Sequence, residues 1–118
     1  MYYAYFIDNG FFALNFSFSS NLGTLLENLV FTELVKSGYE IYFYKNDFEC
    51  DFVIKTREGL EGIQVCYELN DQNRKREFTG LQKLSKQFSL SKQTIITYNQ
   101  EETMDEINVI PFWKYFYK

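Results

Sequence analysis

Apolar residues are spaced in two ways along the chain, and the two spacings predict strands and helices. Short apolar stretches bounded by turn residues are typical of strands. They fall at residues 1–8, 39–44, 49–55, 60–69, 93–98 and 107–110. Short turns at 45–47 and 57–59 separate the second, third and fourth stretches, which predicts an antiparallel meander. Residues 99–106 are acidic and are expected to form a loop.

Two longer segments have apolar residues at helical spacing. From Leu22 to Ser37 apolar side chains cover most of the circumference, so a helix buried on more than one side is predicted. Gly38 follows at the position where a left-handed residue commonly ends a helix. A second helix is expected to begin near Asn70-Asp71, which offers an N-cap, and to run to Leu90. The aromatic tail 111–117 is expected to pack as a flap or to contact another domain.

The order of these elements predicts the fold class. The predicted order is strand, helix, three strands, helix, strand and short strand. This order indicates a mixed α/β fold with helices flanking a mixed sheet. A chain of 118 residues is long enough for one core and too short for two, so a single domain over residues 1–118 is expected. With 20% aromatic residues, that core should be rich in rings.

The residue types that are missing or rare exclude several kinds of chemistry. The chain contains no histidine, which excludes Ser-His and Cys-His catalysis and histidine-based metal sites. Its two cysteines are expected to be free thiols in a reducing cytosol. No apolar run is long enough to span a bilayer, and the N-terminus lacks the features of a signal peptide. A cytoplasmic protein without membrane contact is therefore predicted.

Three polar residues lie where apolar surroundings are expected. Asp51 opens a strand, Gln64 lies inside the next strand, and Glu27 lies on the apolar helix. In metal-dependent nucleases, which this layout resembles, a helix carboxylate joins two strand acids around a divalent metal, and Mg²⁺ prefers such oxygen ligands. The metal would activate water and stabilise a phosphoryl transition state. Each residue also has a structural interpretation: Asp51 as a turn cap, Glu27 as an acid favoured by the helix dipole, and Gln64 as a partner for backbone groups.

The position two residues after Gln64 weakens the catalytic interpretation. A metal-dependent nuclease site of the form D…(D/E/Q)xK has lysine there, and this chain has Cys66. A thiol is neutral at pH 7 unless its surroundings lower its pKa, so Cys66 does not replace the lysine charge. The neutral amide of Gln64 also supplies less charge for a dication than a carboxylate would. Lys45, at the end of the preceding strand, is the candidate for a lysine that has moved to another position.

The charge balance bears on nucleic-acid binding. A net charge of −4 and a pI of about 4.8 disfavour tight non-specific DNA binding. The acidic chain nevertheless contains one basic run, Arg74-Lys75-Arg76, at the start of the predicted second helix. It is a candidate phosphate contact beside the nuclease-like cleft, and the alternative is a solvated helix face.

The motif residues resemble a known family. The resemblance is to domain-of-unknown-function family 4143, a nuclease-like domain that ends many prokaryotic AAA-type ATPases and is related to the PD-(D/E)XK restriction-endonuclease-like superfamily. The matching segments are 5–10, 23–31 with its Leu-Leu-Glu-Asn, 38–44, 49–53, 63–67, 76–77 and 110–114. The resemblance implies a restriction-endonuclease-like core, α-β-β-β-α-β, over residues 22–98. In that family the ATPase module lies N-terminal to this region. This sequence has no G-x-x-x-x-G-K-[ST] loop of its own for ATP.

Three functions follow from these observations. The first is a nuclease-fold accessory domain of a AAA-type ATPase, catalytically weak or inactive, with a nucleic-acid-related or docking role. The second is an active Mg²⁺-dependent DNase. The third is a protein-interaction or dimerisation module whose aromatic ends contact the ATPase module or a second copy of the chain.

Overall fold

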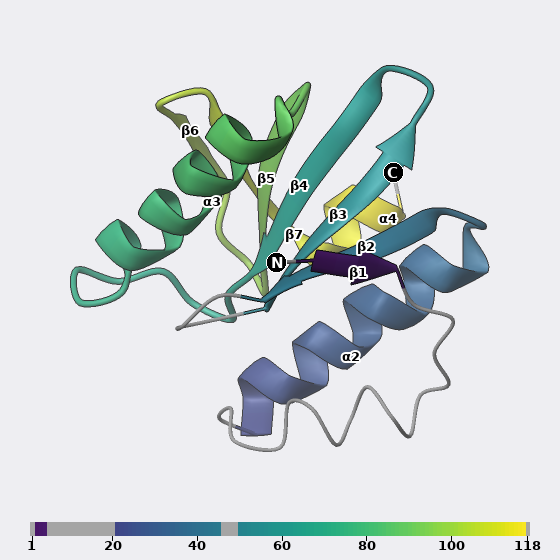
Figure 1. The fold of residues 1–118 in the computed structure, drawn as a ribbon. Helices are drawn as coiled ribbons and strands as arrows, with labels where there is room; N and C mark the ends of the chain where they lie inside the picture. Colours follow the sequence, from purple (N-terminus) through teal and green to yellow (C-terminus); the bar gives the residue numbers. More distant parts are fainter. Residues whose placement is uncertain (1, 5–20, 46–49, 118) are drawn as a thin grey trace.

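A computed structural model describes residues 2–4, 21–45 and 50–117. Seven strands in these ranges form one sheet in the order β1-β2-β3-β4-β5-β7-β6 (Figure 1). The strands are β1 (Tyr2–Ala4), β2 (Glu40–Lys45), β3 (Cys50–Thr56), β4 (Gly59–Val65), β5 (Lys92–Thr97), β6 (Glu102–Met104) and β7 (Ile107–Pro111). The helices are α2 (Asn21–Lys36), α3 (Arg74–Phe88) and α4 (Phe112–Phe116).

The sheet is mixed because its connections differ in length. Strands β1 to β4 pair antiparallel, and the short turn between β3 and β4 lets Thr56 face Gly59. Parallel neighbours need a longer crossover, and α3 supplies it between β4 and β5. Strand β7 is also parallel to β5, and β6 pairs antiparallel with β7 at the edge. The mixed α/β class predicted from the sequence is confirmed.

The helices cover opposite faces of the sheet. Alternate strand residues pack against α2 and α4 on one face and against α3 on the other. The first cluster consists mainly of Val30, Phe31, Leu34, Ile41, Phe52, Ile54, Ile63 and Ile96. The second consists mainly of Val53, Leu69, Phe78, Leu81, Leu84, Ile95, Ile107 and Val109. Gly62 belongs to the α3 face, where a Cβ would lie 2.5 Å from Leu90 Cδ1, so the close packing of the helix region on β4 favours glycine.

The helix and strand predictions are confirmed for most of the described chain, with shifted bounds. Helix α2 ends at Lys36, one residue before the predicted end, and Gly38 has a left-handed φ of 81°. Helix α3 begins at Arg74 instead of near Asn70, because residues 71–73 form a turn. Strand β4 ends at Val65, four residues before the predicted end at Leu69.

One prediction about the C-terminal part was wrong, and the expected packing of the aromatic tail is confirmed. The supposed loop 99–106 contains β6, which forms a hairpin with β7 through Asp105 and Glu106, both at positive φ. The tail after Pro111 begins with α4, for which Pro111 is the N-cap residue. Side chains of α4 pack on the α2-side cluster, but Trp113 remains 53% exposed.

Helix α2 is less enclosed than its composition suggests. Leu25 and Leu29 are 58% and 51% exposed, so the prediction of a helix buried on more than one side was wrong for these positions. Residues 5–20 lie outside the described residues. They include Asn9-Gly10, for which the sequence predicts a turn, and segment 11–18, in which apolar residues alternate loosely. Within the described ranges, no helix combines the length and apolar character needed to cross a membrane.

Candidate functional site

The neighbouring ends of β3 and β4 bring the predicted site positions into one region. The register pairs Phe52 with Ile63, so Asp51 and Gln64 are the next positions along the two strands. Asp51 also pairs with Tyr44 in β2, directly beside the pair formed by Lys45 and Cys50. The predicted meander therefore brings the backbones of these positions together. The side chains of Asp51 and Lys45 lie outside the described residues.

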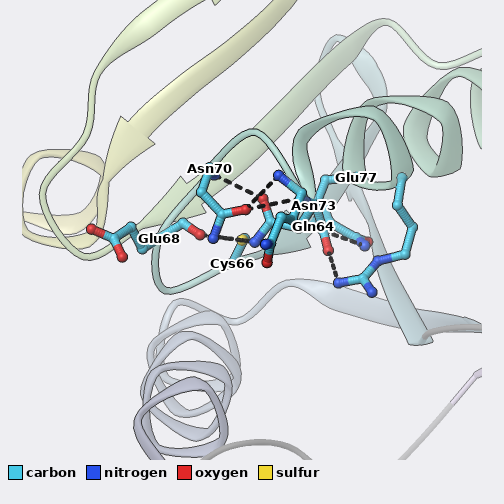
Figure 2. A network of polar contacts seen from close by, with 8 residues as sticks. Gln64, Cys66, Glu68, Asn70, Asn73 and Glu77 are labelled. Carbon is cyan, nitrogen blue, oxygen red and sulfur yellow. Dashed lines mark hydrogen bonds and ion pairs between the residues drawn. The ribbon is translucent and has the colours of Figure 1, made fainter.

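Gln64 forms a buried contact with α3. Its side chain is 2% exposed, and its amide Nε2 donates a hydrogen bond of 2.7 Å to Oε1 of Glu77 (Figure 2). Glu77 is also 2% exposed, and its second oxygen lies 3.2 Å from Nη2 of Arg76, whose side chain reaches solvent. Because a carboxylate only accepts hydrogen bonds, the amide nitrogen of Gln64 is the atom that faces Glu77. The α3-facing end of Gln64 is thus a donor and not a metal ligand.

Cys66 lies just beyond the end of β4 and contacts the connection to α3. Its thiol donates a hydrogen bond of 3.3 Å to the carbonyl of Glu68. Asn73 Nδ2 donates to the same carbonyl at 2.9 Å and also lies 3.6 Å from the Cys66 sulfur (Figure 2). These contacts tie the end of β4 to the connection that leads into α3. This is a structural role at the position where the nuclease pattern has lysine.

Asn70 stabilises the turn that leads into α3. Its side-chain oxygen accepts from the backbone N–H groups of Gln72 and Asn73 at 2.8 and 3.0 Å. In return, Asn73 Oδ1 accepts from the N–H of Asn70 at 2.9 Å. These contacts stabilise the turn at residues 71–73, but the N-cap residue of α3 is Asn73, so the N-cap predicted at Asn70-Asp71 was wrong.

Glu27 lies on α2, across the sheet from the Gln64–Glu77 contact. Its neighbours one helical turn on, Val30 and Phe31, pack on the α2 face of the sheet. Glu27 is half-buried, with Oε2 buried among protein atoms. In residues 2–4, 21–45 and 50–117, no group of three or more His, Cys, Asp or Glu side chains is arranged to hold a metal ion. Because the side chain of Asp51 lies outside the described residues, the Mg²⁺ site of Glu27, Asp51 and Gln64 stays a prediction.

The basic run at the start of α3 is mostly paired. Arg74 makes two hydrogen bonds, of 2.7 and 3.0 Å, with the carboxylate of Glu102 in β6. The hydrogen bond from Arg74 lowers the pKa of Glu102, and the same contact raises the pKa of Arg74. Arg76 is paired with Glu77, whereas Lys75 is exposed. Two of the three predicted phosphate contacts are thus engaged within the protein.

Sequence reasoning missed the residues that complete this network. Glu77 follows three basic positions and reads as a solvated helix residue, yet it is buried against Gln64. Asn73 was equally hidden, because Asn70 satisfies the same capping pattern earlier in the chain. One signal could have revealed a buried partner such as Glu77. Gln64 is a polar residue inside the apolar strand β4, and a buried polar side chain requires a hydrogen-bond partner.

These features define a mixed α/β domain in which α3 and the end of β4 share a buried polar network. The chain belongs to the family described as "Domain of unknown function (DUF4143)", which matches residues 22–115. It is also similar to "Uncharacterized protein MJ1544" of Methanocaldococcus jannaschii, with 41% identity over 125 aligned residues. That match covers 93% of this chain and 28% of the relative, so the chain spans less than a third of the length of that protein. No solved structure matches this chain.

Proposed function

We propose that this chain is a nuclease-fold accessory domain that does not cleave nucleic acid efficiently with Mg²⁺. The observation that carries the proposal is the hydrogen bond from Gln64 Nε2 to Glu77 Oε1. A metal-dependent nuclease needs a ligand oxygen at this strand position and a lysine two residues later. Here the amide donates to a carboxylate, and the thiol of Cys66 donates to a backbone carbonyl.

The order of elements supports the nuclease-like part of the proposal. Helix α2, strands β2 to β4, helix α3 and strand β5 follow one another in the order expected for a restriction-endonuclease-like core. The adjacency of the backbones of Asp51 and Gln64 supports this assignment, because the nuclease pattern has its metal ligands on two neighbouring strands. In this chain α3 supplies Arg76 and Glu77 to that region, which replaces an open charged site with a closed polar contact.

A metal titration followed by thermal unfolding tests this proposal. An ion that binds only the folded state raises the free energy of unfolding by RT ln(1 + [L]/Kd). This is about 2.7 kcal/mol when the free ion concentration is a hundred times Kd. We expect Mg²⁺ and Mn²⁺ to shift the unfolding temperature of wild type and Asp51→Asn equally. Asp71→Asn is the control, because Asp71 is exposed at the turn before α3. A metal-dependent rise that Asp51→Asn alone removes would contradict the proposal and favour the active DNase.

A docking role is the second candidate, and one observation favours it. Leu22, Leu25 and Leu29 lie three to four positions apart on α2, and all are more than half exposed. An apolar stripe of this kind is typical of a surface that another protein segment covers. The matched relative is more than three times as long as this chain, so homologous proteins carry further segments. We propose that such a segment, from an ATPase module preceding this domain, packs on α2.

A further inference from the structure

A second polar region lies on the other face of β4, in a cavity between α4 and the neighbouring strands. Glu61 is 5% exposed, and its Oε2 accepts hydrogen bonds from Thr94 Oγ1 at 2.7 Å and from the Tyr115 hydroxyl at 3.2 Å. Burial, followed by the neighbouring Glu61 carboxylate, raises the pKa of Tyr115 well above the usual phenol range. Both neighbours of the carboxylate are thus neutral donors.

The carboxylate of Glu61 lacks a cationic partner among the described residues. No ion pair involves it in the described ranges, although Lys92 lies beside it in the ladder of β4 and β5. A buried carboxylate without a counter-charge is costly, because hydroxyl donors replace only part of its hydration. Glu61 also lines a cavity of about 670 Å³, so a cation that enters this cavity can reach it.

Two hydroxyl groups of the cavity wall already use their protons within the protein. The hydroxyl of Ser37 donates to the carbonyl of Glu33 at 2.8 Å, and that of Ser91 donates to the carbonyl of Leu60 at 3.0 Å. Each hydroxyl has one proton, so these oxygens can offer only lone pairs to a further ligand. Such a wall is complementary to a ligand that has donors and no acceptors.

The charges and rings of the cavity agree with this chemistry. Two carboxylates, Glu58 and Glu61, line it against one ammonium group, that of Lys92. Tyr39 and Phe116 add aromatic surface to the wall, which can pack on an alkyl chain and attract a cation. A dication is a poor fit, because Mg²⁺ would need several charged or carbonyl oxygens at fixed octahedral positions.

We propose that this cavity binds a donor-only organic cation, an alkylammonium or alkylguanidinium group, with Glu61 as its counter-ion. The cavity lies on the α2 and α4 side of β4, whereas the Gln64–Glu77 contact lies on the α3 side. The proposal is therefore independent of whether the domain cleaves nucleic acid.

Titrations of the 118-residue chain with butylguanidinium and butylammonium, followed by amide NMR shifts, test the proposal. Saturable shifts are expected at Tyr39, Ser91 and Phe116. Butylurea, which has a similar shape without the charge, should produce none. Equal binding of butylurea would overturn the proposal. A short peptide with a central arginine distinguishes the source of the cation, since its binding would indicate a protein side chain and its exclusion a small free ligand.

Two variants with opposite expected effects keep the test decisive. Glu61→Gln retains acceptors for Thr94 and Tyr115 but loses the charge, and it should weaken binding about tenfold. Lys92→Met removes the competing ammonium at an exposed position, and it should tighten binding about threefold. Glu68→Gln, exposed and outside the cavity wall, is the control. Unchanged affinity in a folded Glu61→Gln, or weaker binding in Lys92→Met, would overturn the proposal. If Glu61→Gln does not fold, Lys92→Met decides.

Discussion

Nε2 of Gln64 lies 2.7 Å from Oε1 of Glu77, and both side chains are almost entirely buried between β4 and α3. This contact explains why a polar residue is found inside an apolar strand. It also fixes the orientation of the amide whose carbonyl oxygen was expected to bind a metal, because the amide nitrogen is held by the carboxylate of Glu77. The consequences for stability can be measured directly.

Gln64→Glu should destabilise the domain by about 3 kcal/mol at neutral pH, because it buries two carboxylates against each other. Like charges raise the pKa of one acid, so the folded state binds more protons than the unfolded state. The destabilisation should therefore shrink as the pH falls, which denaturant unfolding at two pH values measures. Gln82→Glu, on the exposed side of α3, is the control and should have little effect.

The exchanged pair provides a sharper check of the same contact. Gln64→Glu combined with Glu77→Gln again gives one donor and one acceptor, and the negative charge then lies on β4 instead of on α3. We expect the double variant to recover most of the stability that Gln64→Glu loses. Additive destabilisation by the two substitutions would show that the contact does not account for the burial of these residues.

The Arg74–Glu102 ion pair should make a small contribution that depends on pH and salt. The pKa of Glu102 is lowered in the folded state, so its contribution is present above the unfolded pKa and is lost as the pH falls through the folded pKa. Both side chains are about a third exposed, so Glu102→Gln should cost less than about 1 kcal/mol at pH 7. At acidic pH or in high salt, the variant and wild type should unfold at the same denaturant concentration. A large cost that persists under those conditions would contradict this interpretation.

Two glycines near α3 should respond to alanine in opposite directions. Gly62→Ala should destabilise the domain by about 1 kcal/mol, because the new Cβ meets Leu90, Leu81 and Leu84 and flexible side chains must shift. Gly80→Ala should stabilise it by about 0.5–1 kcal/mol, because nothing lies within 4 Å of that Cβ and alanine favours the helix. Thermal unfolding of the two variants side by side measures the difference. Effects of the same sign would show that α3 packs on β4 differently.

The exposed stripe on α2 should cause self-association when no partner covers it. We expect the chain to associate at high concentration, and Leu25→Glu with Leu29→Glu to reduce that association. Lys83→Glu on the exposed surface of α3 is the matched control for added negative charge. Light scattering at increasing concentration is the measurement. A wild-type chain that remains monomeric throughout would count against the docking role.

Local patterns predicted the elements whose signals are local, and missed those that depend on partners. The meander and α2 follow from short turns and helical spacing, and the structure contains both. Strand β6 was hidden because its two-residue turn, Asp105-Glu106, lacks the glycine or asparagine that usually marks positive φ. Helix α4 was hidden among aromatic residues, although a proline at its start was an available signal.

The adjacency of Asp51 and Gln64 was predictable from the sequence, but the contacts of Gln64 were not. The register of β3 and β4 places Asp51 and Gln64 at neighbouring positions, as strand order suggested. The partner of Gln64 depends on how α3 packs on the sheet and on which face of α3 points toward β4. The spacing of residues along the chain does not determine that orientation. Glu77 therefore became visible only once α3 and β4 were seen together.

A cleavage assay tests the central claim most directly. The 118-residue chain is incubated with plasmid and single-stranded DNA in Mg²⁺ and in Mn²⁺, alongside Asp51→Ala and Lys45→Ala. We predict no cleavage by wild type above the level of Asp51→Ala in either metal, because Cys66 stands where the nuclease pattern has lysine and the amide of Gln64 supplies no charge for a dication. Robust cleavage by wild type that is abolished in Asp51→Ala would contradict the claim and establish an active nuclease, and its loss in Lys45→Ala as well would identify the relocated lysine.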